Sequence, residues 1–219
     1  AMMKKRKPTE KLQRTAYHEA GHAVIGWYWR RPIGRVTIVR GKEFLGRTEV
    51  PRWGLSDSEH CSVHDLEINI DISLAGKMAD RKRFGDEQSG DMGQGRWAGD
   101  YMEAAETVKQ RIIKTNQHKE CLEKIDTFMA DSQKGLFRLE SEFLKTYGWN
   151  VERLMERPHV WGCIEALADK LIEQRELSGE EAKTIIQERW GEMDGDSHEE
   201  KHEPEDEELG WGYFRKENL

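Results

Sequence analysis

Apolar side chains at helical spacing dominate the N-terminal part of the chain. One stripe runs from Leu12 to Trp27, and a second runs from His18 to Trp29. Recurrence every three or four residues predicts an α-helix, and Thr9 is a suitable N-cap at its start. Because the two stripes make this helix apolar on two sides, we expect it to be buried.

The next pattern is typical of β-structure. Residues 35–40 contain alternating β-branched side chains, and residues 44–50 can run back after turn residues 41–43. This pattern predicts two antiparallel strands. No later segment has an obvious strand pattern, so we expect a single hairpin next to the first helix.

Helical periodicity returns after the hairpin and continues to about residue 190. Asp57 or Ser58 is the expected N-cap of a helix that ends at Gly85. A glycine-rich stretch follows, and further helices are expected over residues 100–112 and through most of 121–190. The predicted fold class is therefore mainly α, with one small β-hairpin.

Length and charge divide the 219 residues into one domain and two tails. We expect a flexible basic arm over residues 1–8, a single helical domain over 9–190 and an acidic, disordered tail over 191–219. The net charge of −7 argues against nucleic-acid binding. No run of eighteen apolar residues occurs, so no membrane span is expected.

The cysteines indicate the compartment. Cys61, Cys121 and Cys163 are odd in number and widely spaced. That pattern favours free thiols in a reducing environment. No segment has the apolar core of a signal peptide, and we expect a cytoplasmic location.

The candidate chemistry lies in the first helix, in the sequence His18-Glu19-Ala20-Gly21-His22. Residues four apart lie on one helix face, so the two imidazoles can bind one metal ion. Glu19 lies about 100° further round the helix, where it can reach a water on the metal as a general base. This is the zincin arrangement, and it predicts a zincin-like domain with one Zn²⁺ per chain.

The motif at residues 18–22 is open to a second interpretation, and the chain contains a second match to it. The two histidines can instead be core residues with local hydrogen bonds and no metal. A second match to the motif, residues 198–202, lies among acidic residues and has no apolar face. We interpret this second match as part of a solvated tail.

A catalytic zinc needs a third protein ligand. Asp100 is a candidate because it follows the glycine-rich stretch and opens an apolar helix. However, Asp100 and Glu103 also fit a helix-capping box. Glu103, Asp91 and Glu67 are rival carboxylates, and the residues alone leave the choice open.

A family resemblance narrows that choice. Residues 15–24 resemble the zinc helix of the peptidase domain of FtsH-type ATP-dependent zinc metalloproteases. Residues 36–38 and 45–48 resemble that family's strand pair, and residues 74–81 and 84–85 resemble its second helix. Residues 98–104 lie where the family carries its third zinc ligand, so the resemblance implies Asp100 in that role. In total the resemblance covers residues 9–112 and 160–190.

The chain also departs from the family pattern. Arg47 replaces an apolar residue of the second strand, and Arg96-Trp97 replaces small residues before the third ligand. The 219 residues contain no Gly-Lys-Ser/Thr phosphate loop and no transmembrane segment, both of which the family normally carries. We therefore expect a stand-alone peptidase domain. An ATPase acting in trans and a homo-oligomer are both compatible with the resemblance.

The leading functional hypothesis is a zinc endopeptidase acting on unfolded or loosely folded polypeptides, with Glu19 as general base. Leu45, Gly46 and Arg47 are expected to pair with an extended substrate, although Gly46 can also be a turn or bulge glycine. Asp80 either hydrogen-bonds a zinc-binding histidine or is a surface carboxylate.

Two alternatives to this hypothesis remain. One is a non-enzymatic helical interaction module with a structural or residual metal site. The other is hydrolysis of a non-peptide amide.

Overall fold

The computed structural model describes residues 8–42, 45–51, 62–85, 98–114 and 132–196. Its elements, in chain order, are α1 Glu10–Tyr28, β1 Val36–Thr37, β2 Arg47–Thr48, α2 Val63–Phe84, α3 Ala98–Lys114, α5 Ser132–Glu156, α6 Pro158–Gln174, β3 Glu176–Leu177 and α7 Gly179–Asp196. The predicted fold class, mainly α with a small β element, is confirmed.

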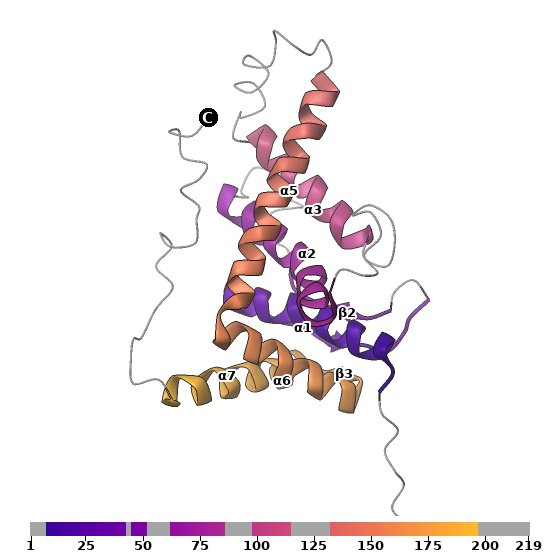
Figure 1. The fold of residues 1–219 in the computed structure, drawn as a ribbon, viewed down its shortest axis with the longest axis vertical. Helices are drawn as coiled ribbons and strands as arrows, with labels where there is room; N and C mark the ends of the chain where they lie inside the picture. The colour runs from indigo at the N-terminus through magenta and orange to yellow at the C-terminus, as the bar shows by residue number, and fades with distance from the viewer. Residues whose placement is uncertain (1–7, 43–44, 52–61, 86–97, 115–131, 197–219) are drawn as a thin grey trace, which may run out of the picture.

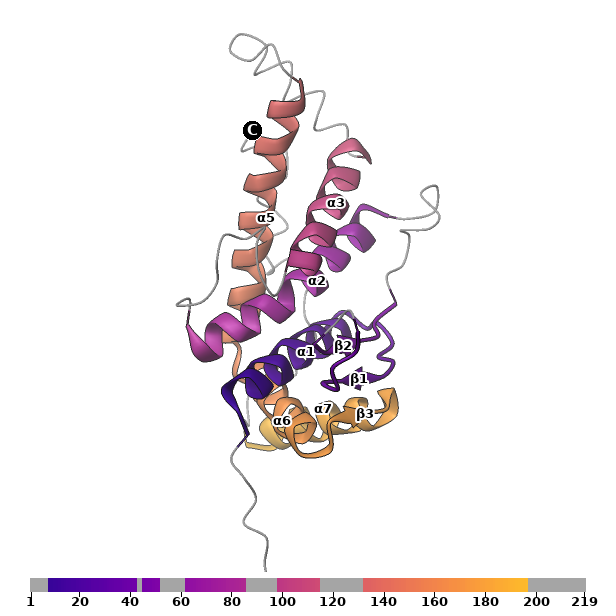
Figure 2. The ribbon, with the colours of Figure 1, turned by 90° about the vertical axis from the view of Figure 1, so that its right-hand side faces the viewer.

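Helix α1 lies in the middle of the molecule. In both ribbon views α2, α3 and α5 lie on one side of it and α6 and α7 lie on the other (Figures 1 and 2). Its side chains are buried on two faces, as the two apolar stripes predict, and those of Ala16, Ala20 and Val24 have no exposed surface. The polar groups of its buried part, from Arg14 to His22, therefore face other protein atoms.

The helix ends follow local capping chemistry. Thr9 accepts a hydrogen bond from the Leu12 amide and caps α1, as predicted. Helix α2 begins later than expected, because Ser62 and Asp65 form a capping box at its N-terminus. Asp57 and Ser58, the predicted caps, lie outside the described residues. Gly85 ends α2 with a positive φ of 79°.

The β-structure is a three-stranded antiparallel sheet with the order β2-β1-β3. Val36 of β1 pairs with Thr48 on one side and with Leu177 on the other. The prediction of a lone hairpin was wrong, since β3 is only two residues long and too short to show alternation. Within the part of the chain that the structure describes, β2 is an edge strand that lies against α1.

A second apolar cluster fixes helix α3. Its buried members come from α2, α3 and α5, and they are Ile70, Leu74, Ala104, Ala105, Val108, Phe143, Leu144 and Tyr147. This packing holds α3 against α2. The first turn of α3, which contains Asp100, is thereby brought to α1.

The C-terminal boundary differs from the prediction. Helix α7 continues to Asp196, beyond the expected end of the domain at residue 190. Met193 lies so close to Gly162 of α6 that an added Cβ would be 2.8 Å from its sulfur, and this contact explains the extension. The arm 1–7, the remaining tail and the second His-Glu motif lie outside the described residues.

Two remaining predictions concern thiols and membranes. Cys163 is free and buried, and burial raises the pKa of its thiol to about 12. Cys61 and Cys121 lie outside the described residues. In the described part of the chain, every helix is too short or too polar to cross a bilayer.

Candidate metal centre

His18 and His22 lie one turn apart on α1 and share one face. Their side chains are almost fully buried, at 3% and 8% exposure. The two Nε2 atoms lie 3.0 Å apart, and the rings meet nearly edge to face, at 85°. The helical spacing therefore places two nitrogen donors at one point, as the sequence predicts.

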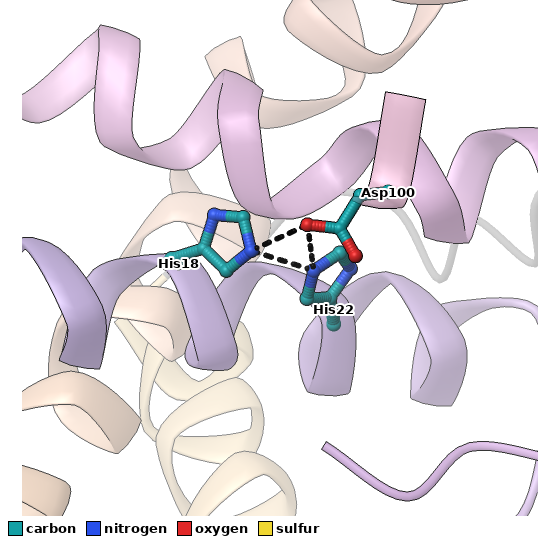
Figure 3. Close-up of side chains that lie close together, drawn as sticks. All are labelled: His18, His22 and Asp100. Carbon is teal, nitrogen blue, oxygen red and sulfur yellow. Dashed lines mark hydrogen bonds and ion pairs between the residues drawn. The ribbon is translucent and has the colours of Figure 1, made fainter. Parts of the chain in front are cut away.

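Asp100 approaches this point from the first turn of α3. Its Oδ2 lies 3.0 Å from His18 Nε2 and 3.8 Å from His22 Nε2 (Figure 3). One donor atom from each of the three side chains lies within 4.8 Å of the others. Among the described residues, no other group of three His, Cys, Asp or Glu side chains converges in this way.

The rival carboxylates lie elsewhere or are not described. Glu67 is ion-paired with Arg111 at 2.7 Å and accepts a hydrogen bond from the Tyr147 hydroxyl. Glu103 does not belong to the converging group, although it lies on the same helix as Asp100. Asp91 lies outside the described residues. Of the described candidates, only Asp100 reaches the two histidines.

Helix α2 orients both imidazoles from the opposite side. His22 Nδ1 donates to the Ile72 carbonyl at 2.6 Å, and the Gly76 backbone lies directly beside the His18 ring. A bond of this kind fixes the tautomer and leaves the other ring nitrogen free to bind a metal. Sequence reasoning missed both contacts, because a backbone acceptor has no residue-type signature.

Two glycines allow α1 and α2 to approach this closely. A Cβ at Gly76 would lie 2.5 Å from His18 Cε1, and it would also overlap His22 Nε2. A Cβ at Gly21 would lie 2.7 Å from the Ala75 carbonyl oxygen. The Gly21 of the motif is therefore required by helix packing, and Gly76 by the imidazoles themselves.

The three groups shift one another's pKa values. Burial lowers the pKa of His18 to about 4, and the positive charge of His22 adds to this. For His22, burial is outweighed by the hydrogen bond and charge of Asp100, so its pKa is raised. Despite burial, the two histidines hold the pKa of Asp100 far below its usual range. The carboxylate is thus ionised beside two nitrogen donors.

Glu19 lies next to this group but does not belong to it. Its side chain is buried, and burial raises the pKa of its carboxyl to about 7. Thr48 Oγ1 donates to Glu19 Oε2 at 2.7 Å. A carboxylate with this pKa beside a metal-ligand set is suited to accept and return a proton near neutral pH. The chain thus places two nitrogen donors, a carboxylate and a candidate base together.

Comparison with known proteins agrees with this geometry. The model of peptidase family M41 matches residues 5–115, which carry every side chain of the converging group. The chain belongs to peptidase family M41. The family resemblance predicted from the sequence is confirmed, and the family is one of zinc metalloproteases.

Curated relatives of this M41 chain have related names. The ATP-dependent zinc metalloprotease YME1 homolog of Caenorhabditis elegans is 24% identical over 82% of this chain, and the match spans 26% of that protein. The ATP-dependent zinc metalloprotease FtsH of Thermus thermophilus is 27% identical over 79% of this chain and 28% of its own length. The chain thus spans about a quarter of the length of these relatives.

Of the three predicted substrate residues, Gly46 lies against Glu19. Gly46 packs so tightly that a Cβ there would lie 2.6 Å from Glu19 Oε1. Arg47 is exposed on the edge strand, and Leu45 is half-buried. Packing against Glu19 is thus one reason for a glycine at position 46. The role of these three residues in substrate binding stays a prediction.

Asp80 lies one turn beyond Gly76 on α2. It is buried, and both its carboxylate oxygens lie 3.2 Å from Arg14 Nη1, one turn before His18 on α1. The interpretation as a surface carboxylate was wrong, because it was made without knowledge of the partner helix. Hydrogen-bonding of a zinc-binding histidine by Asp80 stays a prediction.

Replacing Asp80 with alanine is expected to lower the free energy of unfolding by about 3 kcal/mol, because the buried Arg14 would lose its buried partner and keep only its ion pair with the exposed Glu10. Urea denaturation measures the change. The matched control is Glu173→Ala, which breaks an exposed ion pair with Lys170 and should have no measurable effect. Equal effects of the two substitutions would show that the buried pair does not stabilise the α1–α2 contact.

Proposed function

We propose that this chain is a zinc-dependent endopeptidase that hydrolyses peptide bonds in unfolded or loosely folded polypeptides. One observation carries the proposal: His18, His22 and Asp100 converge within 4.8 Å, and buried Glu19 lies next to them. Membership of peptidase family M41 supports the same reaction class.

His18, His22 and Asp100 would hold the metal. Two imidazole nitrogens and one carboxylate oxygen form a donor set that suits Zn²⁺ and leaves a coordination position open. When bound in such a set, zinc acts as a Lewis acid that lowers the pKa of a coordinated water to about 7. The hydrogen bond from His22 to the Ile72 carbonyl keeps Nε2 directed at the other donors.

Glu19 is the proposed general base. Its carboxylate accepts the proton of the attacking water and then delivers that proton to the nitrogen of the leaving amine. The raised pKa of Glu19, about 7, favours both transfers near neutral pH. Thr48 donates to Oε2, so the other oxygen, Oε1, is left to carry the proton.

Strand β2 is the proposed substrate platform. It is an edge strand among the described residues, and an extended polypeptide can add to such an edge through main-chain hydrogen bonds. Leu45, Gly46 and Arg47 would then flank the substrate beside Glu19. Most backbone N–H and C=O groups of a folded domain are already paired, and for that reason we propose unfolded or loosely folded substrates.

Partners and location are also proposals. The relatives are named ATP-dependent, and these 219 residues contain no Gly-Lys-Ser/Thr phosphate loop. We therefore propose an ATPase outside these residues that delivers polypeptides, with a homo-oligomer as a compatible assembly. The free thiol of Cys163 fits a reducing compartment such as the cytoplasm.

The test is degradation of casein, an unfolded polypeptide, by the purified protein. We expect cleavage of casein but not of a compact folded protein, loss of cleavage on treatment with 1,10-phenanthroline, and recovery on addition of zinc. Mass spectrometry of the fragments would show internal cleavage. Stoichiometric zinc binding without cleavage of any polypeptide would overturn the proposal and favour the interaction-module alternative.

A further inference from the structure

The edge strand β2 contacts the candidate general base at two positions. Thr48 Oγ1 donates to Glu19 Oε2 at 2.7 Å and also lies 3.0 Å from the Glu19 carbonyl oxygen. Gly46 lies against the same side chain, where an added Cβ would be 2.6 Å from Oε1 and 2.8 Å from Cγ. The strand therefore packs directly against the Glu19 side chain.

Strand geometry explains why these two residues make the contacts. Successive side chains of a strand point to opposite faces, so positions 46 and 48 face α1 together. Arg47, between them, is exposed. The contacts with Glu19 thus require a glycine at position 46 and favour a threonine at position 48. The exposed Arg47 can differ from the family pattern without disturbing Glu19.

Of the two Glu19 oxygens that the Thr48 hydroxyl reaches, the carboxylate oxygen is the nearer. Among the described residues, Thr48 supplies the one side-chain hydrogen bond that the structure gives to the Glu19 carboxylate. The carboxylate is buried, so losing the donor would leave Oε2 without a hydrogen bond in a site with little water. An unpaired buried oxygen of this kind rotates or is displaced, since an unsatisfied polar group is unfavourable.

We propose that Thr48 is a positioning residue for Glu19: its hydroxyl holds the carboxylate in the orientation that proton transfer requires. The catalytic part of this inference rests on the proposed function, whereas the contact between Thr48 and Glu19 does not depend on activity.

The position of Thr48 on β2 also has a consequence for substrate binding. A polypeptide that pairs with β2 would bind to the strand that fixes the base, so substrate engagement and base orientation would be linked through Thr48.

The first experiment compares Thr48→Val with Thr48→Ser in peptide cleavage. Valine keeps the shape without the donor, whereas serine keeps the donor. For Thr48→Val we expect kcat to fall roughly 10- to 100-fold, the range of a hydrogen bond to a charged group. KM and zinc content should stay close to those of the wild type. Thr48→Ser should restore most of kcat.

Thr37→Val is the matched control. Thr37 lies on the neighbouring strand β1, opposite Arg47, and its hydroxyl contacts Val39 and Arg175 rather than Glu19. This substitution removes a hydroxyl from the same sheet and should leave kcat unchanged. Equal losses in Thr37→Val and Thr48→Val, or no rescue by serine, would show a purely structural role and overturn the inference.

A double-mutant cycle tests the contact without any activity measurement. Thr48→Val and Glu19→Ala are made singly and together, and the thermal midpoint is measured for each protein. We expect the double variant to lose less than the sum of the single losses, because both substitutions remove the same bond. The cycle of Thr37→Val with Glu19→Ala should be additive.

Additive behaviour of Thr48→Val with Glu19→Ala would overturn the inference, even in an active enzyme. If Thr48→Val and Glu19→Ala were coupled in a protein that cleaves no polypeptide, the proposed function would be wrong, but the contact between Thr48 and Glu19 would be supported. The two failures are therefore distinguishable.

Discussion

Replacement of Glu19 with glutamine is expected to abolish peptide cleavage while leaving zinc bound. Glutamine has nearly the same shape as glutamate and can still accept the hydrogen bond from Thr48, but it cannot take a proton from the attacking water. General-base catalysis contributes roughly 10²- to 10⁴-fold, so kcat should fall by about that factor. Initial rates on a quenched peptide, with zinc content measured on the same sample, check this expectation.

Glu106→Gln is a suitable control for this substitution. Glu106 is exposed on α3 and pairs with Lys109, so its replacement should leave both zinc and activity unchanged. If Glu19→Gln cleaved the peptide at the wild-type rate, Glu19 would not be the general base. Loss of zinc together with activity would instead show that Glu19 acts in metal retention.

Much of this site could be predicted because its chemistry is local. Helix geometry alone places His18 and His22 on one face and Glu19 beside them, and the apolar stripes of the same helix show that the face is buried. No long-range information was needed for that inference. The second match at residues 198–202 has the same spacing without the stripes, so the pattern of neighbouring residues separated the two matches.

Contacts between elements were harder to predict. Asp100 lies 82 positions from His18, and from the residues alone it competed with other carboxylates, so its assignment depended on the family resemblance. The Ile72 carbonyl and the Gly76 backbone were missed because main-chain groups occur at every position. The inward position of Thr48 could have been predicted. In a strand, Gly46 and Thr48 lie on the face opposite the charged Arg47, so they are expected to face the protein interior.

The error in the sheet has a similar cause. Strand β3 contains only Glu176 and Leu177, and its pairing with β1 depends on how α6 and α7 pack rather than on its own sequence. For Asp80 the sequence left two interpretations open and indicated neither its burial nor its partner, since Arg14 lies on another helix. Sequence patterns therefore predicted which faces are buried, but not which residues meet across them.

Replacement of Asp100 with alanine is expected to prevent stable zinc binding. The carboxylate lies 3.0 Å from His18 Nε2 and carries the negative charge of the donor set. Loss of a group that only supports a ligand already weakens metal binding 10- to 100-fold, so removing a ligand should weaken it by more than about a hundredfold. Competition with a chromogenic chelator measures the affinity, and elemental analysis after dialysis measures the retained zinc.

Thermal unfolding gives an independent measure of the same loss. A metal that binds only the folded state raises the unfolding midpoint, so zinc should stabilise the wild type and have little effect on Asp100→Ala. Glu103→Ala is the matched control, because Glu103 lies in the same helix but outside the converging group. It should keep both the zinc and the stabilisation. If Asp100→Ala retained equimolar zinc while Glu103→Ala lost it, the third ligand would be Glu103, and the first turn of α3 would have to rotate on metal binding.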